Sequence, residues 1–423
     1  MKKILSIVLA ATMALSVTAC SGSGTEQSSS EAATTAAQEE ASQEDSSEAA
    51  EDTEKAVGSG ETIKIGCIQD LSATTAVTGV ALAEGVRWRV EEINAAGGIN
   101  GKQIELIEYD SKASVDESVN AYNRLVSEGV VAVVGPLQSN IGIALASIAE
   151  EAGIPYVTNA NDNRVTRQGD DGRGDVWSYM FTAQPSLDEM GAIMAKYALE
   201  ELGYSKFGII YRSDNAYSQA LLNSFQAYSE ANGGEIVSVQ SFLSTDTDYR
   251  TLLGKLISED IDCIFAPNYI QELVVMTQQA RALGYEGTII SGLEAAPPFA
   301  SMCGPEADGT IFLSNVDLEG EDVLAVVDKW VESTGNEAPD QLNKFCLGYD
   351  ELGMIAQCIE AAGEDPAAIR DALENLTDFQ GLTGTISIDP ATHQPKPMGM
   401  IIGQVEDGKD VCITNYAAEP VIN

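Results

Sequence analysis

The chain has little of the chemistry that enzymes and metal sites usually need. It holds one histidine in 423 residues, His393, which precedes Gln-Pro and is expected in a loop. Without a second histidine, we expect neither a Ser–His catalytic site nor a histidine-rich metal site. The sequence has no GxSxG motif, no P-loop, no dinucleotide GxGxxG motif and no CxxC pair. These absences predict a protein that is not an enzyme, with no metal site and no cofactor.

Positive charge is also scarce. The chain has 23 Lys and Arg against 65 Asp and Glu, a formal charge of −42. Residues 1–60 contain ten acids and three basic residues and contribute −7, so the remaining residues carry −35. Charge of this size opposes binding to nucleic acid and to anionic membrane surfaces. We therefore expect no nucleic-acid partner, and we interpret the acids as a solvated surface.

Long hydrophobic runs are missing from the body of the chain, which begins near residue 61. A membrane-spanning helix needs at least about 18 apolar residues in a row, and the body has no such run. The body is therefore predicted to lie outside the bilayer. At about 363 residues it is too long for one hydrophobic core and typical of two lobes.

The spacing of the cysteines does not match a recognisable disulfide framework. Six lie in the body at irregular spacing. Cys67 and Cys263 sit in apolar, strand-like runs and are predicted to be buried free thiols. A disulfide that involves Cys303 stays open as an alternative.

The amino terminus has the pattern of an export signal. A short basic start precedes an apolar run from Ile4 to Ala14, within the roughly 7–15 residues of a secretory signal core. Small residues then precede Cys20, which resembles a bacterial lipoprotein cleavage box. The resemblance implies that residues 1–19 are removed and that the Cys20 sulfur carries diacylglycerol. The alternative is an ordinary cleaved signal in which Cys20 has no special role.

Residues 20–60 are predicted to be a disordered acidic tether. They are rich in Ser, Thr, Ala, Gln and Glu, and they have too few apolar side chains to offset the entropy of ordering. At about 3.3–3.6 Å per residue the tether reaches on the order of 130 Å. A lipid-anchored protein on the outer face of a Gram-positive cell membrane fits this arrangement best.

The body alternates strand and helix patterns in two successive series, which predicts an α/β fold of two Rossmann-like, doubly wound lobes with a hinge. We assign residues 61–182 and 315–380 to lobe 1, and residues 183–314 and 381–423 to lobe 2. Gly384–Ile388 and Met398–Val405 are expected as strands that could pair in a hairpin. In open sheets of this kind, ligands bind beyond the carboxyl ends of the strands, and paired lobes close around a ligand by hinge bending.

Four stretches of the body resemble one protein family in the expected order. Residues 90–102 read VEEINAAGGINGK, 133–139 read VVGPLQS, 280–284 read ARALG and 379–386 read FQGLTGTI. They are similar to solute-binding proteins for branched-chain and other amino acids, with the type I periplasmic binding fold. The first stretch is quite specific, whereas each of the others alone is weak.

The resemblance implies a clamp for a zwitterion. The loop that ends in Gln138 and Ser139 looks like the family's carboxylate-binding loop, and it lies where a strand is predicted to end and a helix to begin. A helix N-terminus can hold an anion with its free N–H groups, although Ser139 or Asn140 could instead cap the helix. Glu294 lies where the family usually has an acid for the α-ammonium of the ligand, although it could also be a solvated loop acid.

Other site residues are carried over from the same family. Tyr217 matches a loop in which a tyrosine often flanks the ligand, and Asn268 and Tyr269 follow another predicted strand. Asn161 takes the place of a small polar residue, with a register uncertain by one position. Thr78 stands where an aromatic residue is usual. The extra amides and the lost ring indicate a pocket more polar than one for leucine.

We therefore expect an extracytoplasmic solute-binding lipoprotein of an ABC importer. It would capture a small amino acid, branched-chain or more polar, or a related amide, and deliver it as a monomer to a membrane permease. The alternative is a ligand-sensing receptor of the same fold that acts on a signalling partner. A sugar ligand is a weaker rival, because the loops offer no clear aromatic platform.

Overall fold

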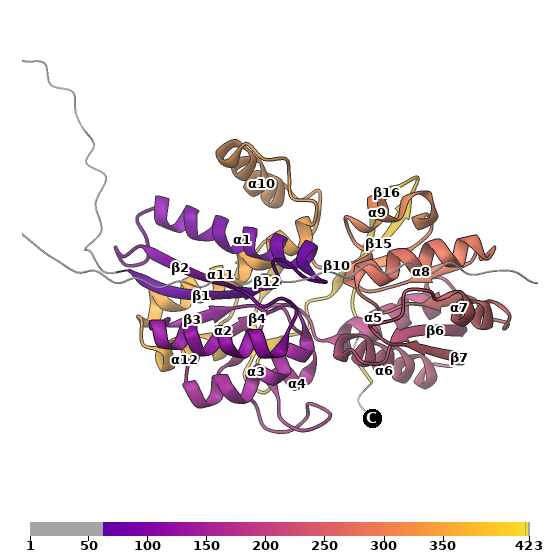
Figure 1. The fold of residues 1–423 in the computed structure, drawn as a ribbon, viewed down its shortest axis with the longest axis horizontal. Coiled ribbons are helices and arrows are strands. Elements are labelled where there is room, and N and C mark those ends of the chain that lie inside the picture. Colours follow the sequence, from indigo (N-terminus) through magenta and orange to yellow (C-terminus); the bar gives the residue numbers. More distant parts are fainter. Residues whose placement is uncertain (1–61, 419, 422–423) are drawn as a thin grey trace, which may run out of the picture. The chain divides into compact units, whose positions relative to one another are not determined.

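The computed structural model describes residues 62–418 and 420–421 (Figure 1). The predicted signal peptide, Cys20 and the tether lie outside these residues. In the described part of the chain, no helix is long and apolar enough to cross a membrane, and no group of acidic, histidine or cysteine side chains is placed to hold a metal ion.

The first sheet has five parallel strands in the order β2-β1-β3-β4-β5. The strands are β1 (Ile63–Gln69), β2 (Ile104–Asp110), β3 (Ala132–Val134), β4 (Tyr156–Thr158) and β5 (Met180–Thr182). Because β1 lies between β2 and β3, the chain changes direction across the sheet at β1 and β3, and this switch point is where open sheets bind ligands.

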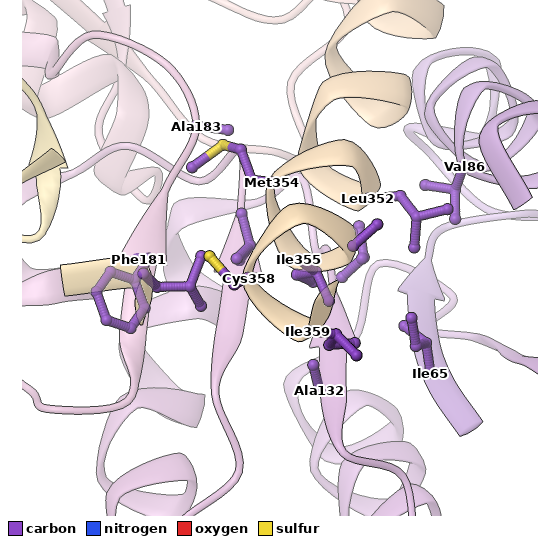
Figure 2. Close-up of a cluster of buried hydrophobic side chains, with 14 of the residues drawn as sticks. Ile65, Val86, Ala132, Phe181, Ala183, Leu352, Met354, Ile355, Cys358 and Ile359 are labelled. Atoms are coloured by element: carbon purple, nitrogen blue, oxygen red, sulfur yellow. The ribbon is translucent and has the colours of Figure 1, made fainter. Parts of the chain in front are cut away.

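Helices cover both faces of the first sheet. One face packs against α1 (Ala76–Ala95), α11 (Leu342–Ala362) and α12 (Pro366–Glu374), and the other against α2 (Val115–Glu128) and α3 (Ser139–Ala152). Figure 2 shows how α11 places Leu352, Ile355 and Ile359 against β1 and β3, with Val86 of α1 beside them. Helix α10 (Glu321–Thr334) packs on α1 and α11 through Trp330.

The second sheet has seven strands in the order β16-β15-β10-β9-β8-β6-β7. They are β6 (Lys206–Arg212), β7 (Glu235–Phe242), β8 (Cys263–Phe265), β9 (Thr288–Ile290), β10 (Ile311–Ser314), β15 (Met400–Glu406) and β16 (Lys409–Tyr416). The first five are mutually parallel, whereas β15 and β16 add an antiparallel edge. The switch point of this sheet lies between β6 and β8.

The second sheet is also covered on both faces. Helices α5 (Leu187–Glu200) and α6 (Ala216–Ala231) pack on one face, and α7 (Arg250–Ile257), α8 (Ile270–Ala282) and α9 (Phe299–Cys303) on the other. The remaining elements are short: α4 (Asn163–Thr166), η1 (Leu293–Ala295), η2 (Gly304–Ala307), β11 (Phe379–Gly381), β12 (Gly384–Ile386), β13 (Ile388–Asp389) and β14 (Gln394–Pro395).

The expected doubly wound α/β architecture is confirmed, but the expected hairpin is wrong. Strand β12 pairs with β11, and β15 pairs with β10 and β16. Ile386 and Ile388 pack into the core of the first sheet, although the boundary that we placed at residue 381 assigns them to the other lobe. The division of the chain into lobes otherwise stays a prediction.

The cysteine and histidine expectations have mixed outcomes. Cys67 and Cys263 are buried and free, as predicted, and Cys303 is buried and free rather than bridged. His393 lies in the connection between β13 and β14, but its side chain is buried. Its ring stacks on Phe181, with the ring centroids 4.2 Å apart. Burial lowers the pKa of His393.

Candidate functional site

Several of the predicted site residues lie beyond the carboxyl ends of the strands at the two switch points. Gln138 and Ser139 follow β3, and Tyr217 and Tyr269 follow β6 and β8. The two groups are in contact through Asn140, whose Oδ1 accepts a hydrogen bond from the backbone N–H of Ala216 at 2.8 Å. The start of α3 on the first sheet therefore meets the start of α6 on the second.

The start of α3 is buried and has no side-chain cap. Ser139 is the first helical residue and is 2% exposed. Gln138 occupies the capping position, but its side chain makes no capping bond to the first turn. Its amide Nε2 instead donates to Thr75 Oγ1, which leaves Gln138 Oε1 buried with no partner among the described residues. Uncapped N–H groups at a helix start form a binding position for an anion.

The loop before α3 lies tightly over the end of β1. Gly135 adopts a φ of 97°, and a Cβ at this position would lie 2.1 Å from the carbonyl oxygen of Ile68. Only glycine fits such a close approach in a left-handed conformation. In the loop between β1 and α1, Asp70 accepts from the backbone N–H and the hydroxyl of Thr75, at 2.7 and 2.8 Å. Thr78 is buried on the first turn of α1 that follows.

Tyr217 and Tyr269 form a stacked pair. Their ring centroids are 5.3 Å apart and the planes differ by 10°. The hydroxyl of Tyr217 is buried without a hydrogen-bond partner in the part of the chain that the structure describes. Burial raises the pKa of both tyrosines, and the nearby Glu294 carboxylate raises it further. Both hydroxyls therefore stay protonated at neutral pH, and that of Tyr217 can donate to a ligand.

Glu294 already has a cationic partner in the protein. It lies in η1, after β9, and its Oε1 is 2.9 Å from Nζ of Lys344 on α11. The side chains are 3% and 5% exposed. The alternative of a solvated loop acid is therefore wrong. The acid that we expected to pair with the α-ammonium of a ligand is therefore already paired with a lysine ammonium.

Two predicted amides have structural partners. Asn161 Nδ2 donates to the carbonyl of Pro185 at 2.8 Å. Asn268 is used at both ends: Nδ2 donates to the Ile210 carbonyl and Oδ1 accepts from the Arg212 N–H, at 2.9 and 3.0 Å. Both side chains hold the loops around the site in place.

Some residues at the same strand ends were missed in the sequence. Asn159, directly after β4, is 1% exposed, and neither end of its amide has a partner within residues 62–418. The buried side-chain oxygens Oε1 of Gln184 and Gln341 also have no hydrogen-bond partner within residues 62–418. Buried polar groups normally have partners, so these atoms indicate a place for water or ligand. The positions of Asn159 and Gln184 shortly after strands were a usable signal, whereas Gln341 directly precedes α11 and nothing local to Lys344 indicates its ion pair.

The comparisons with known proteins agree on one family. A model of the periplasmic binding protein family matches residues 62–410. The Leu/Ile/Val-binding protein BraC3 of Rhizobium johnstonii is 27% identical over 330 residues, which cover 77% of this chain and 87% of that protein.

Solved structures give the same result. The branched-chain amino acid transporter substrate-binding protein LivJ of Streptococcus pneumoniae, in complex with isoleucine, is 29% identical with a TM-score of 0.74, covering 85% of this chain and 100% of that one. The leucine-binding protein LivK of Thermotoga maritima is 27% identical with a TM-score of 0.74, covering 84% and 99%. These matches confirm the type I periplasmic binding fold. They also confirm that the chain is not an enzyme, because this family consists of extracytoplasmic substrate-binding proteins. The chain belongs to the periplasmic binding protein family.

Proposed function

We propose that this protein is the solute-binding lipoprotein of an ABC importer, and that it captures a small amino acid or a related small molecule for a membrane permease. The relatives named above are binding proteins for leucine, isoleucine and valine by their names, which supports the amino-acid class. We further propose that it acts as a monomer, anchored through Cys20 to the outer face of the membrane of a Gram-positive cell.

The observation that carries the proposal is a buried set of unpaired polar atoms around an uncapped helix start. The first turn of α3 with Ser139 offers N–H groups and a hydroxyl to a carboxylate. Tyr217 adds a buried hydroxyl, and Asn159 adds both a donor and an acceptor. A buried polar atom left unpaired costs about 1–3 kcal/mol, so a small polar ligand that pairs these atoms gains affinity. We assign the carboxylate of the ligand to Ser139, and its other polar end to the side of Glu294.

A binding screen tests this function. The purified protein is titrated calorimetrically with a panel of amino acids, amides, organic acids, sugars and nucleobases. We expect one or a few amino acids or close relatives to bind. Ser139→Ala and Asn159→Ala should each weaken binding about tenfold or more, because each removes a partner of the ligand.

A matched serine serves as the control. Ser118 is also buried at the start of a helix, but its hydroxyl donates to the Ser114 carbonyl within α2, away from the site. Ser118→Ala should leave affinity unchanged. If only sugars or nucleobases bind, or if Ser139→Ala and Ser118→Ala behave alike, the proposed ligand class and site are wrong.

The anchor and the transport role are tested in cells. We expect metabolic labelling with a fatty acid to mark the wild-type protein, and Cys20→Ala to abolish the label and release the protein into the medium. Deletion of the gene should abolish high-affinity uptake of the ligand found in the screen. Normal uptake in the deletion strain would contradict the importer role.

A further inference from the structure

Glu294 and Lys344 form a buried ion pair at the candidate site. Lys344 is one of only 20 Lys and Arg that follow residue 60, since the chain has 23 and three lie before that point. Most long cations stay at the surface, because a buried ammonium loses its hydration. Here the lysine projects from the start of α11, on the first core, to a carboxylate that follows a strand of the second sheet.

The surroundings of Lys344 leave Glu294 as its charged partner. Glu351 lies two turns further along α11 and is buried with no hydrogen-bond partner for either carboxylate oxygen among the described residues. Burial raises the pKa of Glu351, which favours the neutral form of this carboxyl. The hydroxyl of Tyr217, near the Glu294 carboxylate, is neutral as well. The ion pair of Lys344 with Glu294 is therefore a nearly fully buried charge pair at this side of the site, and the more exposed pair of Arg212 with Glu272 lies near it.

The lysine ammonium changes the balance of charges that a bound ligand would meet. A zwitterion clamped between the α3 start and an unpaired Glu294 would bring one carboxylate and one ammonium, so the filled site would hold two carboxylates and one ammonium. With Lys344 in place, the protein itself supplies that ammonium. The same set of two carboxylates and one ammonium is completed by a ligand that brings a carboxylate and no ammonium. The ammonium of a neutral amino acid would instead lie close to the lysine ammonium, and like charges in a desolvated site repel.

We propose that Lys344 is a ligand-binding, specificity-determining residue, and that the site takes a small carboxylic acid whose negative charge is not balanced by its own ammonium. Such a ligand is either an acid without an α-amino group, or an amino acid whose second carboxylate pairs with the Lys344 ammonium and so offsets the repulsion of its own ammonium. This inference rests on the proposed function, because it specifies the ligand charge for the same site.

Two pairs of ligands test the proposal on the purified protein. Leucine is compared with its keto acid, ketoisocaproate, which lacks the ammonium, and glutamine is compared with glutamate, which has a second carboxylate. We expect the acid of at least one pair to bind about tenfold or more tightly than its neutral partner. The pair that shows the preference identifies which kind of acid the site takes.

Substitution of the lysine should remove this preference. Lys344→Met leaves Glu294 free to receive an ammonium, so we expect the acid to lose about tenfold or more in affinity while its neutral partner gains. If Lys344→Met does not fold, the double variant Lys344→Met with Glu294→Gln removes both charges, and it should also lose the preference for the acid. The control is Lys206→Met, which removes an exposed lysine ion pair with Asp260 and should change neither affinity.

The outcomes separate this inference from the proposed function. If neutral amino acids bind more tightly than their acidic partners, or if the preference survives in both lysine variants, the role of Lys344 is wrong and the proposed function stands. If no amino acid or carboxylic acid binds in the wider screen, the proposed function is wrong and this inference is overturned with it.

Discussion

At the scale of single residues, the hydroxyl of Tyr217 separates a binding role from a structural one. It is buried and has no partner among the residues that the structure describes. Tyr217→Phe keeps the ring that stacks on Tyr269, so we expect no loss of stability in the ligand-free protein. The affinity for the ligand should fall about tenfold, as for the loss of one buried hydrogen bond. Chemical unfolding and calorimetric titration measure the two effects.

A second tyrosine gives the opposite expectation. The hydroxyl of Tyr122 donates to the Ile154 carbonyl at 3.2 Å, within the core of the first sheet. Tyr122→Phe should lower the free energy of unfolding by about 1 kcal/mol and leave affinity unchanged. If Tyr217→Phe lowers stability but not affinity, the hydroxyl has a structural role and the site assignment fails at this residue.

Glu351 makes the stability of the protein depend on pH in a defined direction. Burial raises the pKa of this carboxyl in the folded state, so the folded protein keeps a proton that the unfolded chain has already released. The wild type therefore loses stability as pH rises above the ordinary pKa of glutamate, until the raised pKa is passed. Glu351→Gln has no such loss.

Unfolding in urea at several pH values measures this effect. The stability of Glu351→Gln relative to the wild type should rise with pH, by at most about 1.4 kcal/mol per pH unit, and then level off. A difference that stays constant from about pH 5 to about pH 8 would contradict a raised pKa.

The site could be predicted only as far as local sequence determines it. Ser139, Tyr217 and Tyr269 follow strands whose position was readable, so their placement at one edge was predictable. The ion pair of Glu294 was not, because Lys344 lies 50 residues further on and reaches it only through the course of α11. In the same way, Asn159 and Asn161 are equally polar in the sequence, and only packing decides which amide is left unpaired.

At the scale of elements, a feature could be predicted from the sequence where neighbouring residues determine it, but not where contacts between distant segments determine it. Helices α2 and α6 each begin at a side-chain cap, Ser114 and Asn215, which is a signal that the local sequence carries. Helix α5 carries a local signal as well, because Ser186 followed three residues later by Glu189 is a capping-box pattern, and Ser186 caps the helix. The expected hairpin was wrong because the pairing of short strands is decided by the sheet they join, which spacing does not reveal.

The contact between α1 and α11 depends on two glycines that face each other's helix. A Cβ on Gly85 would lie 1.9 Å from the Phe345 carbonyl oxygen, and one on Gly348 would lie 2.1 Å from that of Leu82. Backbone atoms cannot yield as a flexible side chain can, so the helices must separate. Gly85→Ala and Gly348→Ala should each lower the free energy of unfolding by about 3 kcal/mol. Because α11 carries Lys344, both variants should also weaken ligand binding.

A helical glycine without neighbours is the matched control. Gly254 lies inside α7, and a Cβ there would meet nothing within 4 Å. Gly254→Ala should raise the free energy of unfolding by about 0.5–1 kcal/mol, because alanine favours the helix. Equal effects of all three substitutions would show that close helix packing is not the cause.

At the scale of the whole molecule, the net charge sets how stability responds to salt. The residues after position 60 hold 55 acids and 20 basic residues, the totals of 65 and 23 less the ten and three before it, which leaves −35. Folding brings these like charges together, so self-repulsion opposes the compact state. The buried pair of Lys344 and Glu294 is screened much less than surface charges are. The salt response therefore reports on the acidic surface.

Stability should rise steeply at low salt. From about 0.01 M to about 0.15 M ionic strength, the Debye length falls from about 30 Å to about 8 Å, which removes most of the repulsion between distant surface charges. We expect the free energy of unfolding at neutral pH to increase over this range, measured by urea unfolding at fixed temperature. Near pH 4 many carboxyls are protonated, since their ordinary pKa values are about 3.9 and 4.3, so the same salt step should have a smaller effect. A stability that falls with salt at neutral pH would mean that attractive ion pairs outweigh the repulsion, even with acids in such excess.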